Sequence, residues 1–374
     1  MSSHWIARRT KCFDSSGIRK VFDLGAKLAD PINLSIGQPD FDVPEEARRA
    51  AVEAIEGGKN GYSLTQGAPV LREKLQAMVA RQYGHEDREV FVTSGTSGGL
   101  MLAMMALVDP GDEVIVFDPY FVMYDALAAV VGGRVVYVDT YPDFRIDPDR
   151  VAAAITPRTK AIVLNSPANP TGAVAGEEEV RCLAELAARR NVVLVSDEVY
   201  REFCYDRPFV PPAACNPQTL VVDGFSKTYG MPGWRLGFAH GPRAIIQEMV
   251  KLQQYSFVCA PHPLQFAAAV AMDLDTSHHL GAYRRKRDMV VEGLAGLYDL
   301  VTPGGAFYAF PKTPWGTASE FVARAIQEHQ LLIIPGNVFS RRDTHFRISY
   351  AAADAVIQRG IEVLRGMAGG EGRD

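Results

Sequence analysis

The sequence is poor in cysteine and has no long apolar run. Its five cysteines include no Cys-x-x-Cys pair, so neither a disulfide framework nor a zinc site is indicated. The longest nearly apolar run, residues 98–108, is shorter than the roughly 20 residues that a bilayer-spanning helix needs. The opening stretch MSSHWIARRTKCF lacks the apolar core of a secretory signal. We therefore expect a soluble cytoplasmic protein whose thiols are reduced.

The sequence also lacks an excess of basic charge. Its 39 lysines and arginines stand against 44 aspartates and glutamates, a formal net charge of −5. This weakly acidic balance argues against nucleic acid or a membrane surface as the main partner. The adjacent His278 and His279 have no further ligand at helical spacing, and there is no His-Glu-x-x-His motif, so we predict no metal site. With 47% hydrophobic and 22% charged residues, the chain has the composition of a folded globular protein.

Seven short β-branched runs alternate with helical patterns over most of the chain. We expect strands at residues 90–93, 113–117, 134–138, 161–164, 192–195, 220–223 and 236–239. Several are apolar throughout, as in a parallel sheet that helices cover on both faces. Amphipathic helical patterns lie between them, for example from Pro69 to Val79 and over residues 177–190. The alternation predicts an α/β protein whose large domain has a mostly parallel, doubly wound sheet.

The C-terminal part has a different pattern, and 374 residues are enough for about two or three domains. We expect strands in GAFYAF (305–310) and RISYA (347–351), and we expect Ser319 and Asp354 to cap two amphipathic helices. The pattern predicts a smaller α+β domain that the N-terminal residues complete. The expected boundaries are 46–284 for the large domain, with 1–45 and 285–374 forming the small domain.

Polar residues follow four of the expected strands at the point where each strand ends. These segments are SGTSGG (94–99), NSPANPTG (165–172), SDEVY (196–200) and GFSK (224–227). The carboxyl ends of parallel strands meet at one edge of an open α/β sheet, and ligands bind at that edge. The sequence therefore predicts a single site there, whatever its chemistry.

Each candidate in these segments has a structural interpretation beside a functional one. SGTSGG is either a glycine-rich turn or an anion site at a helix N-terminus, and it is not a Walker loop because no Gly-Lys-Ser/Thr follows. Asp197 is either a helix cap or ion-pair partner, or a carboxylate aimed at a cationic ligand group. Lys227 is either a surface charge or an amine nucleophile with a lowered pKa. Arg235 and Arg347 are either surface ion-pair partners or clamps for phosphate or carboxylate.

Taken together, these segments closely resemble the class I/II aminotransferases of fold type I, which use pyridoxal 5′-phosphate. The matching pieces run from LSIGQPDF (34–41) to FRISYA (346–351) and so cover nearly the whole chain. The most specific pieces are SPANPTG (166–172), SDEVY (196–200) and SKTYGMPGWRLG (226–237). The resemblance implies a transaminase that moves an amino group between an L-amino acid and a 2-oxo acid.

The resemblance also implies three catalytic residues, Lys227, Asp197 and Tyr200. Lys227 matches the lysine that forms a Schiff base with the cofactor and, once substrate displaces it, moves a proton to and from the substrate α-carbon. Asp197 matches the carboxylate that keeps the pyridine nitrogen protonated, so that the ring acts as an electron sink. Tyr200 and Asn169 match the partners of the ring's phenolic oxygen.

Further matches concern the cofactor's phosphate and the face of its ring. The positions that match the family's phosphate cradle are Gly95, Thr96, Ser97, Ser226 and Arg235. Phe121 looks like the aromatic residue that stacks on the ring, with Tyr120 as the alternative. Tyr62 resembles a tyrosine that reaches the phosphate of the neighbouring subunit, which implies a homodimer with shared active sites.

Arg347 matches the arginine that holds the substrate α-carboxylate, with help from Asn169 and the backbone at Gly37. Because Arg347 falls in the C-terminal unit, a bound carboxylate is expected to draw the small domain onto the large one. The sequence departs from the family pattern in two places. In the loop after Tyr255 the segment FVCAPHPLQ (257–265) has no hydroxyl residue, where many relatives carry one that contacts phosphate. Arg19 is only a weak candidate for a second substrate-binding arginine.

The motifs leave two other functions open. A lyase on the same scaffold, such as a carbon–sulfur β-lyase, would use the same cofactor residues and differ in whether a group leaves the substrate β-carbon. A ligand-sensing domain of a transcription regulator would share the fold, but no basic helix-turn-helix module precedes the matching segments. We therefore expect amino-group transfer.

Overall fold

Seven strands form the main sheet of the computed structural model, which describes residues 3–25, 28–84 and 88–369. The strands are β2 (Arg88–Ser94), β3 (Glu113–Asp118), β4 (Arg134–Asp139), β5 (Thr159–Asn165), β6 (Val193–Asp197), β7 (Leu220–Gly224) and β8 (Leu236–Pro242). Their order across the sheet is β2-β8-β7-β6-β5-β3-β4. β8 runs antiparallel to β2 and β7, while the other pairs are parallel. The expected strands and the mostly parallel sheet are therefore confirmed.

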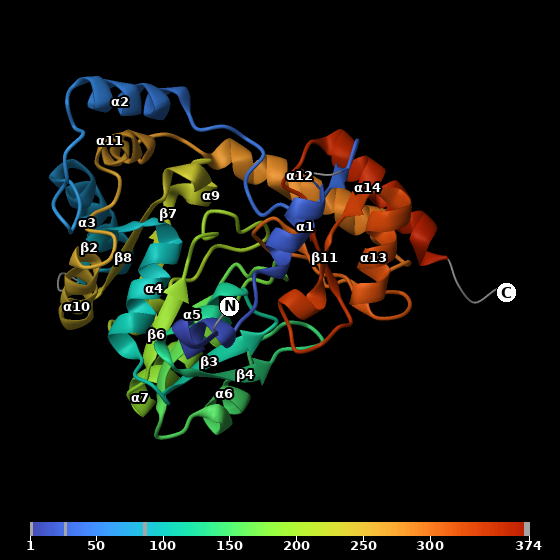
Figure 1. Ribbon diagram of the computed structural model, residues 1–374, viewed down its shortest axis with the longest axis horizontal. Helices are drawn as coiled ribbons and strands as arrows, with labels where there is room; N and C mark the ends of the chain where they lie inside the picture. The colour runs from blue at the N-terminus through green and yellow to red at the C-terminus, as the bar shows by residue number, and fades with distance from the viewer. Residues whose placement is uncertain (1–2, 26–27, 85–87, 370–374) are drawn as a thin grey trace.

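Helices cover both faces of this sheet (Figure 1). One face packs against α4 (Gly95–Leu107), α5 (Met123–Val131) and α10 (Arg243–Gln254). The other packs against α3 (Pro69–Tyr83), α6 (Pro148–Ala154), α7 (Glu177–Arg190) and α11 (His262–Ala271). In β3, Val114 and Val116 join the first apolar cluster, whereas Ile115 and Phe117 join the second. Burial on both faces explains why the strands are apolar at consecutive positions.

The C-terminal part forms a smaller sheet with its own helices, on the right of Figure 1. Its antiparallel strands are β11 (Ile334–Pro335), β12 (Phe346–Ser349) and β9 (Tyr308–Ala309), in that order. The helices are α12 (Ser277–Leu294), α13 (Ala318–His329) and α14 (Asp354–Ala368). Both strands expected here are present, although each is shorter than its sequence pattern.

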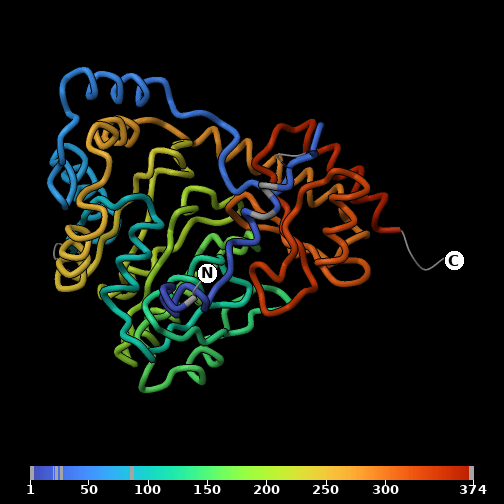
Figure 2. The backbone as a smooth tube through the Cα atoms, in the orientation of Figure 1, coloured from blue at the N-terminus to red at the C-terminus, as the bar shows by residue number. Residues whose placement is uncertain are grey.

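The N-terminal segment runs beside the C-terminal part of the chain (Figure 2). β1 (Ile32–Asn33) pairs in parallel with β10 (Leu331–Leu332). Earlier in the chain, η2 (Arg8–Lys11) contacts α5, one of the helices that cover the main sheet. The expected domain boundary after residue 284 falls inside α12, and the boundaries remain a prediction. The remaining helices are η1 (Ser3–Trp5), α1 (Gly17–Gly25), α2 (Glu45–Glu56), α8 (Pro212–Cys215), α9 (Phe225–Thr228), η3 (Pro232–Trp234) and η4 (Gly336–Val338).

The helix starts expected at Ser319 and Asp354 are wrong by one or two positions. α13 is capped by Thr317, whose hydroxyl accepts the Glu320 backbone N–H while the Glu320 carboxylate accepts the Thr317 N–H. This reciprocal capping box satisfies two helix-end donors, so Ser319 lies inside the first turn. Asp354 is the first residue of α14, after Ala353 at the cap. Of the helices in the described part of the chain, none is both long and apolar enough to cross a bilayer.

Candidate active site

The antiparallel direction of β8 brings a seventh segment to the functional edge of the sheet. The carboxyl ends of the other six strands, β2 to β7, lie at one edge, and the beginning of β8 lies at the same edge because β8 runs the other way. Ser94 pairs with Leu236, and Gly224 pairs with Gly237. Arg235, immediately before β8, is therefore held next to the residues that follow β2 and β7.

A cavity of about 230 Å³ lies at this edge. The site residues expected from the sequence that line it are Gly37, Thr96, Ser97, Phe121, Asn169, Asp197, Tyr200, Ser226, Lys227, Arg235 and Arg347. Gly95 lies behind the wall, where a Cβ would come within 2.7 Å of Nη2 of Arg235. Tyr62 does not line the cavity. Its side chain is 83% exposed beside a separate surface hollow that Ser97 and Arg235 also line.

Lys227 projects from α9, directly after β7, into this cavity. Its Nζ donates a hydrogen bond to the Gly37 carbonyl at 2.6 Å. Burial, together with the nearby guanidinium groups of Arg347 and Arg235, lowers the pKa of Lys227 to about 8. A lysine in this state is neutral in a substantial fraction of molecules near physiological pH, which is the condition for nucleophilic attack.

Asp197 ends β6, and its side chain is 3% exposed. Its Oδ2 accepts a hydrogen bond from the Tyr124 hydroxyl at 2.7 Å. Burial raises the pKa of Asp197 to about 6, although the hydrogen bond from Tyr124 opposes the rise. Tyr124 is a site residue that sequence reasoning missed. The available signal was a phenol in the otherwise mostly apolar segment that became α5.

A chain of hydrogen bonds joins Asp197 to Arg347. Arg347 Nη1 donates to Oδ1 of Asn169 at 2.9 Å, and Nη2 donates to the Ser35 carbonyl at 2.7 Å. The Asn169 backbone N–H donates to Oδ1 of Asn165 at 2.9 Å, and Asn165 Nδ2 donates to the Asp197 carbonyl at 3.1 Å. These bonds fix the amide of Asn169 between the buried guanidinium and the carboxyl end of β6.

Two aromatic rings enclose the Arg347 guanidinium, which is 1% exposed. Its Cζ lies 4.6 Å from the centre of the Tyr308 ring and 4.7 Å from that of Phe339. The Tyr308 hydroxyl lies 2.7 Å from the Tyr200 hydroxyl. Sequence reasoning placed Tyr308 in a strand but missed it as a site residue, because the strand's partner in the fold was unknown.

The first turn of α4 and Arg235 form the opposite end of the cavity. α4 begins at Gly95, whose φ of 72° suits glycine. The Thr96 hydroxyl oxygen is buried and has no hydrogen-bond partner among the described residues. Free backbone amides at a helix start, a hydroxyl and a guanidinium together make a site that could hold a phosphate group.

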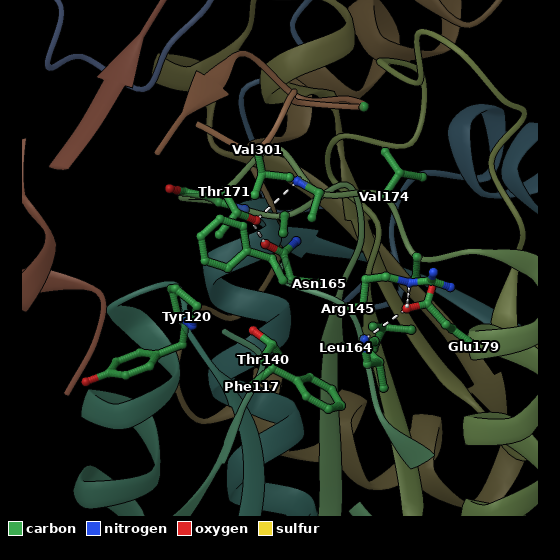
Figure 3. A pocket seen from close by; sticks show the side chains of 18 of the residues that line it. Phe117, Tyr120, Thr140, Arg145, Leu164, Asn165, Thr171, Val174, Glu179 and Val301 are labelled. Carbon is green, nitrogen blue, oxygen red and sulfur yellow. Dashed lines mark hydrogen bonds and ion pairs between the residues drawn. The ribbon is translucent and has the colours of Figure 1, made fainter. Parts of the chain in front are cut away.

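A second cavity, of about 560 Å³, lies on the other side of Phe121, Asn165 and Asn169 (Figure 3). Tyr120 lines this second cavity and not the Lys227 cavity, whereas Phe121 lines both. Of the two aromatic residues proposed to stack on a cofactor ring, Phe121 is therefore the one in contact with the Lys227 cavity. In Figure 3 the Tyr120 ring points away from Asn165.

Comparisons with known proteins agree with this geometry. The family model for class I and II aminotransferases matches residues 29–364. The chain is 38% identical over 356 residues to the aspartate/prephenate aminotransferase of Thermus thermophilus, covering 92% of each chain. It is 32% identical over 375 residues to aromatic-amino-acid aminotransferase 2 of Thermococcus litoralis, covering 96% of each.

A solved structure agrees as closely. The aspartate aminotransferase of Thermus thermophilus with maleate matches with a TM-score of 0.93 at 36% identity, covering 98% of this chain and 100% of that one. These proteins are named for amino-group transfer and not for lyase chemistry. The chain belongs to the class I and II aminotransferase family, and it is an aminotransferase of fold type I.

Proposed function

We propose that this aminotransferase binds pyridoxal 5′-phosphate in the Lys227 cavity and moves an amino group between an L-amino acid and a 2-oxo acid. The observation that carries the proposal is the presence of Lys227 and the buried Asp197 carboxylate in one cavity. The other residues fit the same group. The buried Thr96 hydroxyl has no partner in the described part of the chain, which suits a phosphate acceptor, and Phe121 offers an aromatic face.

The cofactor, when bound, supplies an electron sink for the pair released as the substrate α-proton leaves. Lys227, with a pKa of about 8, would supply the Nζ amine that holds the cofactor's aldehyde carbon, and the same amine, once free, would take the proton from the substrate α-carbon. Asp197, with a pKa of about 6, is ionised at neutral pH and would hold a protonated ring nitrogen by charge. Tyr200 and Asn169 would donate hydrogen bonds to the phenolic oxygen, while Ser226, Arg235 and the start of α4 would hold the phosphate.

Arg347 is proposed to hold the substrate α-carboxylate, with Asn169 and Gly37 beside it. Its Nε is buried and has no partner among the described residues, so the guanidinium retains a donor for a ligand. Arg347 lies in β12 of the small sheet and Lys227 in α9, directly after β7 of the main sheet, so a substrate that bridges them draws the two parts together and excludes water. Because relatives are named for aspartate/prephenate and for aromatic amino acids, aspartate and phenylalanine are the first donors to test.

A homodimer with shared active sites is proposed on the exposure of apolar side chains near the cavity. Tyr62, Leu64, Tyr255, Phe257 and Val258 are exposed, and Tyr62 and Phe257 line a hollow of about 910 Å³ that reaches Arg235. Large exposed apolar groups around a polar site are typical of an interface. We expect Tyr62 of one subunit to reach the phosphate held by the other. The cytoplasmic location and the domain boundaries also remain predictions.

The central test is a half-reaction. Purified protein with added pyridoxal 5′-phosphate should gain a visible absorption band, and an amino donor should remove that band while releasing its 2-oxo acid. A broad panel of donors that leaves the band unchanged would contradict the proposal. Release of pyruvate and ammonia from cysteine-like substrates, with no oxo acid added, would instead support the carbon–sulfur lyase.

A further inference from the structure

Tyr308 lies where three parts of the site meet. Its hydroxyl is 2.7 Å from the Tyr200 hydroxyl, and its ring stacks against the Arg347 guanidinium at 4.6 Å. A Cβ on Gly37 would come within 2.5 Å of the same hydroxyl, and the Gly37 carbonyl accepts the Lys227 amine. Tyr308 is 1% exposed, so its phenolic oxygen has no bulk water to bond.

The hydrogen bond between the two phenols has a preferred direction. Two hydroxyls at this distance form one hydrogen bond, in which either hydroxyl can be the donor and the other the acceptor. Burial raises the pKa of both phenols, and that of Tyr200 is raised further because Asp197 lies near it. The Arg347 guanidinium, stacked on the Tyr308 ring at 4.6 Å, offsets part of the rise in the Tyr308 pKa, so the Tyr308 proton is the more acidic of the two. The same charge repels the hydroxyl proton of Tyr308 towards Tyr200. This arrangement of charge favours Tyr308 as the donor and Tyr200 as the acceptor.

We propose that Tyr308 is a positioning residue, which donates to Tyr200 and so leaves the Tyr200 proton to point into the Lys227 cavity. The Tyr200 hydroxyl has no other hydrogen-bond partner among the described residues, and Tyr200 lines the cavity. Hydrogen bonds in such a chain polarise one another, so a Tyr200 that accepts from Tyr308 is a stronger donor. This inference rests on the proposed function, in which the Tyr200 proton meets the cofactor's phenolic oxygen.

The test compares Tyr308→Phe with Tyr200→Phe and with the double variant, each loaded with pyridoxal 5′-phosphate. Tyr308→Phe keeps the ring against Arg347 and removes only the hydroxyl. We expect the titration midpoint of the visible band to rise by roughly 0.3–1 pH unit, because a weaker Tyr200 donor stabilises the phenolate less. The rise in Tyr200→Phe should be at least as large. The double variant should match Tyr200→Phe alone, because Tyr308 acts through Tyr200.

Tyr350→Phe is the matched control. It removes another buried phenolic hydroxyl of the small sheet, which faces Tyr205 and the Ala306 carbonyl instead of Tyr200, so the midpoint should stay at the wild-type value. The KM for the donor should change less than about twofold in Tyr308→Phe, since the Arg347 contacts persist. A Tyr308→Phe midpoint equal to that of the wild type overturns the inference, as does a double variant whose shift is the sum of the single shifts. A wild-type protein that gains no visible band overturns the proposed function instead.

Discussion

The two cavities on either side of Phe121 differ in size and in the pairing of their charged side chains. The smaller cavity, and not the larger one, holds only unpaired charges. In the larger, at about 560 Å³, the Glu179 and Asp206 carboxylates form ion pairs with Arg145 and Arg287, whereas Asp143 and Arg207 form none among the described residues. The smaller, at about 230 Å³, is lined by four charged residues, Asp197, Lys227, Arg235 and Arg347. None of these four forms an ion pair within the described chain. Unpaired charge in a small cavity therefore marks the reactive site, and volume does not.

This difference has a physical cost that points to function. Burying a charged group without a partner disfavours folding, and proteins retain such groups where a ligand will complete them. In the larger cavity Glu179 and Asp206 already have cationic partners, so no ligand is needed to satisfy these two carboxylates. The contrast predicts that substitutions in the small cavity reduce turnover, while substitutions confined to the large cavity change it little.

The largest effect is expected from Lys227→Ala. Removing the amine removes both the covalent link to the cofactor and the proton carrier, so turnover should fall by about four orders of magnitude or more. The visible band should be lost, while the circular dichroism spectrum and the unfolding midpoint in urea stay close to those of the wild type. A variant that retains substantial transamination would show that another group carries the proton and that Lys227 has been assigned wrongly.

Arg347→Ala should come next. Loss of a buried guanidinium that grips a carboxylate should lower kcat/KM by about 100-fold to 1000-fold for every α-amino acid donor, because the α-carboxylate is common to all of them. Arg347→Lys keeps the charge but not the paired donors, so its kcat/KM should lie between that of the wild type and that of Arg347→Ala. Steady-state kinetics on several donors checks this. An effect limited to donors with one kind of side chain would assign Arg347 to the side-chain pocket instead.

Asp197→Asn should change stability in a pH-dependent way in the protein without cofactor. The folded-state pKa of Asp197, about 6, lies above the ordinary value of 3.8, so folding favours the protonated form. The contribution of Asp197 to the free energy of unfolding is therefore fully present at low pH, where the carboxyl is protonated, and is lost as the pH rises through about 6. Asn cannot ionise, so the variant should exceed the wild type by up to about 3 kcal/mol at pH 7.5, and the gap should close near pH 4.

Urea unfolding at several pH values measures this difference. Equal free energies of unfolding for the two proteins at every pH would mean that burial does not raise the pKa of Asp197. Turnover of the variant should still fall steeply, because a neutral amide cannot hold a protonated ring nitrogen. Stability and activity are therefore expected to move in opposite directions at this position.

Gly37→Ala should have a smaller effect. An added Cβ would lie 2.5 Å from the Tyr308 hydroxyl, so the loop or the ring has to shift. The Gly37 carbonyl and the Tyr308–Tyr200 bond would be displaced together, and we expect kcat/KM to fall about tenfold. In the background of Tyr308→Phe the clash is relieved, and the same substitution should cost less. Equal losses in both backgrounds would show that the clash with Tyr308 is not the cause.

The two sheets also differ in how far the sequence could predict them. The strands of the main sheet are continuous apolar runs, and the polar residues that follow them had to meet at one edge, so Asp197, Asn169 and Lys227 could be grouped before the structure was known. In the small sheet the strands are two to four residues long, too short for periodicity to define them. The pattern left Arg347 as either a surface ion-pair partner or an anion clamp, and its role in holding the substrate carboxylate came from the family resemblance.

The site residues missed from the sequence depend on tertiary packing. Tyr124 reaches Asp197 from α5, which packs on the first face of the main sheet, and Tyr308 reaches Tyr200 across the two sheets. Neither residue is near its partner in sequence, and no local spacing relates them. The error at Ser319 has a local cause, since Thr317 and Glu320 form a capping box that excludes Ser319 from the cap.

The smallest effect is expected from Tyr120→Phe, which tests the comparison from the other side. Tyr120 lines the large cavity and its ring lies 5.1 Å from that of Tyr137. The substitution keeps the ring beside Phe121 and removes a partly buried hydroxyl, so it should cost about 1 kcal/mol of stability and leave kcat/KM within about twofold of the wild type. Phe121→Leu changes the neighbouring ring, which lines both cavities, and should weaken cofactor binding because that ring also faces the Lys227 cavity. A tenfold loss of kcat/KM in Tyr120→Phe would show that the large cavity takes part in catalysis, and the division between reactive and structural cavities would fail.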